Sequence, residues 1–177
     1  MRALTFWKKV IRDRSNMLEE LLKRLDQAHL QYCVIGGQAV NAYVEPLVSL
    51  DLDLVVAAHQ IHQVTSILEK GFILKHFPHS LNISRYGSDL RVQIQTNPRY
   101  SDFIERAVLK PVLGLELPVA CVEDVLQGKI WALEDFQRRT SKRLKDLTDI
   151  ARLLEAYPAL RNQLPESIQK ELGNFLQ

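Results

Sequence analysis

The sequence has few cysteines and no long apolar run, and these shortages narrow the classes of protein it can belong to. Only two cysteines, Cys33 and Cys121, occur in 177 residues, and one disulfide between them is the alternative to two free thiols. We expect both thiols to be reduced and buried in a cytoplasmic protein. No apolar run approaches the roughly 20 residues that a membrane-spanning helix needs. Charged residues interrupt the N-terminal apolar residues early, so we expect neither a membrane span nor a signal peptide.

The sequence also lacks the short motifs of several common enzyme classes. It contains no Gly-x-Ser-x-Gly, no Cys–His pairing and no Walker-type Gly-Lys-Ser/Thr, so the usual hydrolase and P-loop chemistries are not indicated. The net charge of +2 is too small to indicate a partner by itself. A chain of 177 residues is long enough for one domain, or for one domain with a helical extension.

One stretch does carry a specific pattern. Residues 32–35 have the apolar, aromatic and β-branched composition of a buried strand. Gly36 and Gly37 follow, and their lack of a Cβ lets backbone N–H groups approach a ligand. A helix predicted to start after this turn would attract anions through its free N–H groups and its dipole. Asp51 and Asp53 come next, on one face of a second predicted strand, where their mutual repulsion favours a divalent cation with oxygen ligands.

Together these residues resemble the signature of the DNA-polymerase-beta-like nucleotidyltransferase superfamily: an apolar residue, Gly-Gly or Gly-Ser, a spacer, then Asp-apolar-Asp-apolar. The match is carried by Ile35, Gly36 and Gly37, by the spacer 38–50 and by the run 51–54. Within the superfamily the chain is most similar to the small bacterial AbiEii-like branch, which includes toxins of toxin–antitoxin pairs. The resemblance covers roughly residues 30–155.

The resemblance implies the main parts of an active site. Gly36, Gly37 and Gln38 would bind the triphosphate of an NTP, while Asp51 and Asp53 would be catalytic carboxylates that hold Mg²⁺. Ordinary solvated strand carboxylates are the alternative for the two acids. Against that alternative, the run LDLDLVV is a central-strand pattern, in which an unpaired acid is costly.

The superfamily usually adds a third carboxylate from a neighbouring strand, which helps to activate the attacking hydroxyl. The strand predicted over 90–96 takes that place, but its polar face carries Gln93 and Gln95 instead of an acid. Asp89 has the same parity but lies at the start of the strand. A glutamine in this position predicts slow, altered or lost chemistry. Its amide can still contact a metal, a phosphate or a base, so both glutamines are expected nucleotide contacts.

Two motifs in the C-terminal third complete the resemblance. Lys129 begins a Lys-x-x-Ala-like motif, in which a helical lysine faces the site and neutralises phosphate charge as a catalytic residue. Lys145 and Asp146 begin an Arg-Asp-x-x-Asp-like motif, with lysine in place of arginine, and are expected nucleotide contacts. The alternatives are a surface lysine at 129 and an ordinary solvated helix with the i,i+4 pairs Lys142–Asp146 and Lys145–Asp149.

The remaining pattern predicts an α+β fold, with a nucleotidyltransferase-like mixed β-sheet flanked by helices and followed by a C-terminal helical segment. Apolar residues recur at helical spacing over 5–29, which predicts one amphipathic helix packed on the sheet. Another short helix is expected over 100–107. We expect a core with its N-terminal helix over residues 1–120 and a helical extension packed on it over residues 121–177.

These expectations combine into a Mg²⁺-dependent nucleotidyltransferase that moves a nucleoside monophosphate from an NTP to an acceptor, with pyrophosphate leaving. The acceptor is left open between RNA, a protein side chain and a small molecule, and the resemblance implies an antitoxin protein as a partner. The alternative is a nucleotide-binding or interaction module that kept the fold and lost turnover, which Gln93 and Gln95 favour. The hypothesis requires Asp51 and Asp53 to face the same hollow as the glycine turn.

Overall fold

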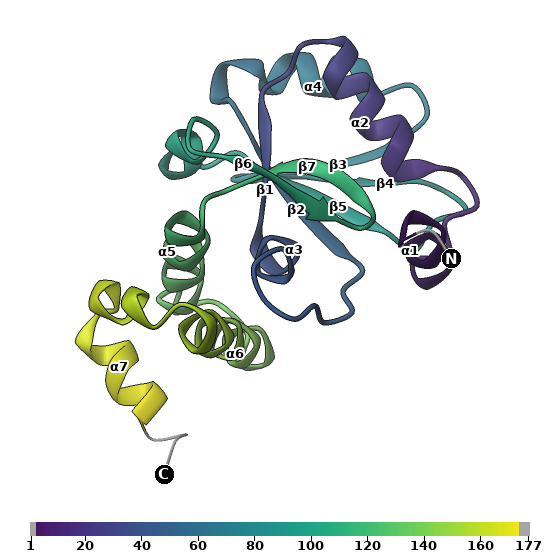
Figure 1. Ribbon diagram of the computed structural model, residues 1–177. Helices are drawn as coiled ribbons and strands as arrows, with labels where there is room; N and C mark the ends of the chain where they lie inside the picture. Colours follow the sequence, from purple (N-terminus) through teal and green to yellow (C-terminus); the bar gives the residue numbers. More distant parts are fainter. Residues whose placement is uncertain (1–2, 174–177) are drawn as a thin grey trace.

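Within residues 3–173, which the computed structural model describes, seven strands form one mixed sheet with helices on both faces (Figure 1). The strands are β1 (Tyr32–Ile35), β2 (Asp51–Val56), β3 (Ile73–Phe77), β4 (Ser80–Ser84), β5 (Arg91–Gln95), β6 (Val108–Val112) and β7 (Leu115–Val119). The α-helices are α1 (Ala3–Val10), α2 (Met17–Gln27), α3 (Gly36–Asn41), α4 (Ile61–Leu68), α5 (Val122–Leu133), α6 (Thr140–Ala156) and α7 (Glu166–Gly173). Three short 3-10 helices are η1 (Ala58–Gln60), η2 (Pro98–Phe103) and η3 (Pro158–Gln163).

The sheet order β3-β4-β5-β2-β1-β7-β6 places the strand with the two acids at its centre. Strand β2 runs antiparallel to β1 and parallel to β5, while β1 pairs in parallel with β7. The outer strands complete the antiparallel pairs β3–β4 and β6–β7. The predicted mixed sheet is thus confirmed. Because β2 has a neighbour on each side, side chains on either of its faces lie over the middle of the sheet.

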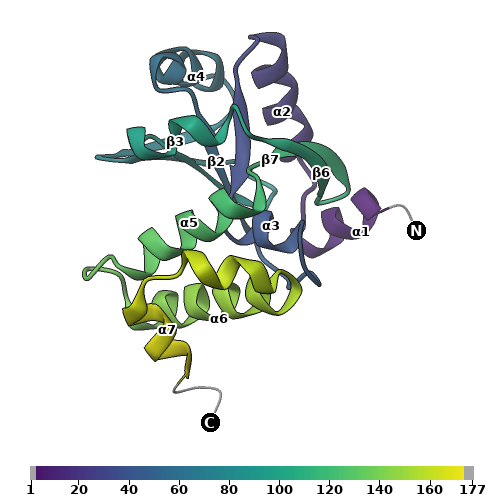
Figure 2. The same ribbon diagram turned by 60° about the vertical axis from the view of Figure 1, so that its left-hand side comes forward.

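The two faces of the sheet are covered by different helices (Figure 1, Figure 2). On one face lie α2 and α4, and the leucines that recur at helical spacing in α2, namely Leu18, Leu21, Leu22 and Leu25, are all buried. On the other face lie α3, α5 and α6, and α3 contacts both of the longer helices. The second face carries the polar side chains of β2 and β5, so the space beside α3 is where a site can form.

The single helix predicted over residues 5–29 is wrong, because the chain forms α1 and α2 with a break between them. Arg12 and Asn16 in the break have φ angles of 47° and 52°, a left-handed conformation that cannot continue an α-helix. Asp13 Oδ1 accepts hydrogen bonds from the backbone N–H and the hydroxyl of Ser15, both at 3.0 Å. Such local bonds compete with the helical ladder.

The structure also differs from the sequence-based predictions in the ends and type of two helices and in the burial of one cysteine. The helix expected to begin after the glycine turn begins at Gly36 itself, and the helix expected over 100–107 is the 3-10 helix η2. Cys33 is buried as expected, but Cys121 is partly exposed. The C-terminal segment begins with α5, and the division of the chain at residue 120 into two domains stays a prediction. None of the helices within residues 3–173 is long and apolar enough to cross a membrane.

Candidate functional site

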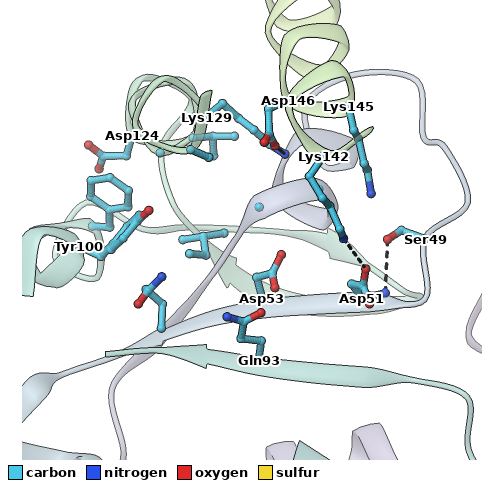
Figure 3. A pocket seen from close by; sticks show the side chains of 18 of the residues that line it. Ser49, Asp51, Asp53, Gln93, Tyr100, Asp124, Lys129, Lys142, Lys145 and Asp146 are labelled. Atoms are coloured by element: carbon cyan, nitrogen blue, oxygen red, sulfur yellow. Dashed lines mark hydrogen bonds and ion pairs between the residues drawn. The ribbon is translucent and has the colours of Figure 1, made fainter. Parts of the chain in front are cut away.

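Asp51 and Asp53 point from β2 into a cavity on the α3 side of the sheet (Figure 3). Leu52 and Leu54, which alternate with them, are 0% exposed, as expected for side chains on the opposite, core-facing side of a strand. The register pairs Ile35 at the end of β1 with Asp53. The glycine turn that follows Ile35 therefore lies beside the second acid.

Gly36 is the residue that makes this close approach possible. Its φ is +67°, in the left-handed region that glycine adopts without strain. A Cβ at this position would overlap the Oδ2 atom of Asp53. The turn and the acid thus share one hollow, which is the arrangement that the sequence hypothesis requires.

We expect Gly36→Ala to be disruptive and Gly37→Ala to be tolerated. Alanine at 36 combines a strained φ with a steric overlap at Asp53, so the free energy of unfolding should fall by about 2 kcal/mol or more. A Cβ at Gly37 would meet Lys145 Nζ at 3.6 Å, an ordinary contact, so that variant should stay within about 0.5 kcal/mol of the wild type. Urea unfolding measures both variants, and equal losses at the two glycines would refute the proposed role of Gly36.

The cavity has a volume of about 420 Å³ and opens between the sheet, α3, α5 and α6. All of the predicted site residues except Gln38 line it: Gly36, Gly37, Asp51, Asp53, Gln93, Gln95, Lys129, Lys145 and Asp146. Residues that are more than a hundred positions apart in the sequence, such as Gly36 and Asp146, therefore meet in one place. The cavity size is within the range of small-ligand sites.

Gln38 supports the cavity from outside its lining. The side chain is 2% exposed, and its Nε2 donates to the backbone carbonyl of Ser49 at 3.1 Å. The Ser49 hydroxyl in turn accepts a hydrogen bond from the backbone N–H of Asp51 at 3.3 Å. Gln38 thus holds the connection that leads into β2, and its side chain is occupied by the protein instead of facing a ligand.

The Asp53 carboxylate has no hydrogen-bond or ion-pair partner within residues 3–173, although it faces several charges. Burial raises the pKa of Asp53 above its usual range, and the negative charge of Asp51 raises it further. The positive charges of Lys129, Lys142 and Lys145 act in the opposite direction and lower the pKa. An unpaired carboxylate that is partly shielded from water is unfavourable, and a bound cation would remove the cost.

Asp51 is held by two cations of the protein. Arg91 lies directly opposite it in the β2–β5 register, with Arg91 Nε and Asp51 Oδ1 2.6 Å apart. Lys142 Nζ lies 3.8 Å from the other carboxylate oxygen (Figure 3). The Arg91 side chain is 67% exposed, so the pair opens towards solvent and the guanidinium is free to leave.

No acid of the neighbouring strand completes the pair of carboxylates. Gln93 occupies the register position opposite Asp53 and lies beside it in the cavity (Figure 3). Asp89 lies outside the cavity lining and pairs with Arg12, with a closest N–O distance of 3.7 Å. Residues 3–173 contain no group of three or more His, Cys, Asp or Glu side chains placed to hold a metal ion. The site therefore offers two carboxylates and a neutral amide.

Lys129 lines the cavity but is bound tightly by two carboxylates of α6. The residue is 6% exposed, and its Nζ lies 3.0 Å from Asp146 Oδ1 and 2.6 Å from Asp149 Oδ2. Burial would lower the pKa of Lys129, but Asp149 and Asp146 outweigh burial and raise the pKa. The lysine is therefore a permanent positive charge in the wall of the cavity.

The i,i+4 ion pairs Lys142–Asp146 and Lys145–Asp149, which a solvated α6 surface would show, do not form. Asp146 and Asp149 are buried and do not bind the lysines one turn earlier. Besides Lys129, Asp146 binds Arg138 at 2.5 Å, and Asp149 binds Arg152 at 2.9 Å. Lys142 instead reaches Asp51, and Lys145 faces the glycine turn. The acids join α5 to α6, which leaves the lysines of α6 free to face the cavity.

Several residues of the cavity wall were not predicted from the sequence. Arg91, Gln93 and Gln95 alternate along β5 and so share one face of the strand. This alternation could have predicted that Arg91 lies at the site. Tyr100 and Phe103 enter from η2 and Asp124 from α5, and only the packing of those elements reveals them. Asp124 is not a free acid, because Arg106 donates two hydrogen bonds of 2.9 Å to its carboxylate.

Comparison with protein families decides the assignment. Residues 12–175 match the model of the family described as "Nucleotidyl transferase AbiEii toxin, Type IV TA system". The chain belongs to the AbiEii nucleotidyltransferase toxin family. The resemblance inferred from the glycine turn and the two acids is thus confirmed, and the family match extends beyond residues 30–155 at both ends. A search of curated proteins gave no match.

Solved structures show the same fold in distant nucleotidyltransferases. The antibiotic-resistance factor ANT(2″)-Ia has a TM-score of 0.57 and 12% identity over 84% of this chain and 91% of its own. The lincosamide antibiotic adenylyltransferase LnuA, solved with lincomycin, has a TM-score of 0.54 and 13% identity over 80% and 99%. An antigenic nucleotidyltransferase-like protein from Paracoccidioides brasiliensis has a TM-score of 0.53 and 18% identity over 79% and 74%. At these identities the likeness shows the fold alone, and it confirms the predicted nucleotidyltransferase-like sheet.

Proposed function

We propose that this AbiEii-family protein transfers a nucleoside monophosphate from an NTP to an acceptor, in a Mg²⁺-dependent reaction that releases pyrophosphate. One observation carries the proposal: the carboxylates of Asp51 and Asp53 face the same cavity as the Gly36–Gly37 turn and a group of lysines. Paired carboxylates beside several lysines are typical of enzymes that use a metal ion to transfer a phosphoryl or nucleotidyl group.

The donor atoms of the site suit a hard divalent cation. Asp53 contributes a carboxylate without a partner within residues 3–173, and Asp51 contributes one whose partners, Arg91 and Lys142, are both exposed enough to be displaced. The carbonyl oxygen of Gln93 is a third oxygen donor close by. Mg²⁺ held by these residues would supply positive charge that offsets the negative charge developing on the phosphate.

Phosphate binding is assigned to the lysines at the mouth of the cavity. Lys142 and Lys145 project from α6 towards the glycine turn and Asp51 (Figure 3). In the described part of the chain neither lysine is paired with a buried carboxylate, so these compact cations can neutralise a triphosphate. Lys129 adds a fixed positive charge from deeper in the wall, where its field also favours the ionised form of Asp53.

A second candidate function follows from Gln93. A neutral amide opposite Asp53 cannot remove a proton from an attacking hydroxyl. The acceptor would then have to arrive with an acidic hydroxyl or lose its proton to water, and turnover would be slow. In the limiting case the protein binds nucleotide without transferring it and acts as a binding or interaction module.

Label transfer tests the function directly. The purified protein is incubated with Mg²⁺ and each α-³²P-labelled NTP, together with total RNA, total protein or small-molecule extracts, and NTP binding is measured in parallel by calorimetry. We expect label to enter one acceptor class, and the matched Asp51→Asn/Asp53→Asn variant to transfer none. Binding without transfer to any acceptor would select the module instead, and failure to bind any NTP would reject both candidates.

The family also suggests a physiological role for the protein, that of a toxin. A toxin of this family would act in the cytoplasm on RNA or on a protein, and an antitoxin protein would be its partner. Expression of the wild type should then arrest growth of a host, and the double asparagine variant should not.

A further inference from the structure

The cavity has two chemically different ends (Figure 3). At one end lie Ser49, Asp51 and the lysines 142 and 145, which suit phosphate and metal. Tyr100 and Asp124 lie at the opposite end, and Asp53 is between the two ends. The carboxylate of Asp124 is paired with Arg106, and the Arg99 guanidinium lies over the ring of Tyr100, 5.1 Å from its centroid.

Aromatic rings make the far end a rigid wall. Tyr100 and Phe103 are 5% and 3% exposed, and their ring centroids are 5.3 Å apart in an edge-to-face arrangement. Trp131 of α5 packs behind both, stacked on Phe103 at 5.7 Å and edge-on to Tyr100 at 5.2 Å. Rings fixed in this way can contact a flat apolar group without reordering.

Gly128 opens space against this wall. It lies in the interior of α5, where glycine is disfavoured, and its backbone is not in the left-handed region. A Cβ at this position would lie 3.5 Å from Tyr100 Cε1 and 3.7 Å from Phe103 Cε2, which are ordinary contacts. Neither backbone conformation nor packing therefore requires glycine here. The effect that remains is the extra room in the cavity that Gly128 lines.

Gln95 supplies a directed polar group at the same end. Strand β5 runs from Arg91, opposite Asp51, to Gln95, so Gln95 is the residue of its polar face that lies farthest from the phosphate end. Its Oε1 accepts hydrogen bonds from the backbone N–H groups of Thr96 at 3.0 Å and Asn97 at 3.2 Å. The carbonyl is therefore occupied, and the amide NH₂, which has no partner within residues 3–173, is left to donate.

We propose that the end formed by Gln95, Tyr100, Phe103 and Gly128 is the subsite for the nucleobase of the donor nucleotide. The base contacts the aromatic wall beside Gly128, where a Cβ would take up space at the surface of the rings, and the Gln95 amide donates to an acceptor atom on the edge of the base. A cavity of about 420 Å³ suits one small ligand, so the molecule whose phosphates meet the lysines also fills the far end. This inference rests on the proposed binding of an NTP.

Two probes separate the ends of the cavity: an NTP, which has a base, and inorganic tripolyphosphate, which has none. Calorimetry with Mg²⁺ compares the wild type with Gly128→Ala and Gln95→Leu. Gly173→Ala is the matched control, because a Cβ in that helix meets nothing within 4 Å. We expect NTP affinity to fall about tenfold in both test variants, tripolyphosphate affinity to stay within about twofold, and the control to match the wild type. Gly128→Ala should also unfold at a higher temperature, because alanine favours the helix.

Three other binding results would each contradict the proposed subsite or the proposed function. Unchanged NTP affinity in both variants would overturn the subsite, even if the wild type binds and transfers nucleotide. Equal weakening of NTP and tripolyphosphate would place the effect at the phosphate end and would also overturn it. If the wild type bound neither probe, the proposed function itself would fail, and this result is distinguishable from the first two.

Discussion

Asp53→Asn is expected to stabilise the fold while abolishing nucleotidyl transfer. Burial, and then the negative charge of Asp51, raises the pKa of Asp53 in the folded protein. A group whose pKa is raised by folding contributes stability that is fully present below its unfolded pKa and is lost as the pH rises through the folded pKa. Asparagine carries no charge at any pH, so at neutral pH the variant avoids this loss. For a domain of this size, each kcal/mol gained raises the unfolding midpoint by about 2–4 °C.

Thermal unfolding of both proteins from about pH 4 to pH 8 tests the sign. The difference should be largest at the alkaline end and should shrink towards the acid end, where the wild-type carboxyl is protonated. Transfer by Asp53→Asn should fall by about a thousandfold or more, because the variant lacks a carboxylate that would hold Mg²⁺ beside the reacting phosphate.

Asp51→Asn is the matched control on the same strand. Its carboxylate is paired with the exposed side chains of Arg91 and Lys142, and exposed pairs contribute about 0–1 kcal/mol each. The control should therefore lose transfer without a gain in stability. If Asp53→Asn unfolded below the wild type at neutral pH, an unrecognised partner would have to stabilise the carboxylate.

The sequence alone predicted those parts of the site that depend on short-range patterns of residues. Strict alternation around Asp51 and Asp53 predicted that both acids share a strand face, and Gly36 marked the point where the chain turns back towards them. Both are short-range rules of strand geometry and backbone sterics. The mixed sheet and the buried stripe of α2 followed from hydrophobic periodicity in the same way.

Tertiary contacts limited the prediction elsewhere. The break between α1 and α2 depends on left-handed residues such as Arg12, which no periodicity reveals. One partner of Asp51 is Arg91, 40 positions away, and this pairing exists only because β2 and β5 are neighbours. The two acids of α6 looked like members of surface pairs, yet the packing of α5 on α6 turns them inwards. Charged side chains are the hardest to place, since helical spacing fits a solvated face and a buried network equally well.

The buried ion pairs of Lys129 with Asp146 and Asp149 give the second prediction with a large expected effect. Lys129→Met should lower the free energy of unfolding by about 3 kcal/mol, because breaking a buried ion pair leaves charge without compensation. The loss should be near the low end of the usual range, since Arg138 still binds Asp146 and Arg152 still binds Asp149. At about 2–4 °C per kcal/mol, the unfolding midpoint should drop by roughly 10 °C.

Urea unfolding of Lys129→Met against Lys145→Met separates the two lysines of the site motifs. Lys145 is exposed and faces the glycine turn, so its loss should leave stability within about 0.5 kcal/mol while weakening tripolyphosphate binding. Adding Asp149→Asn to Lys129→Met removes one of the stranded carboxylates and should restore about 1 kcal/mol. A Lys129→Met protein as stable as the wild type would show that the ammonium is not needed between the two acids, and that it is free to bind phosphate directly.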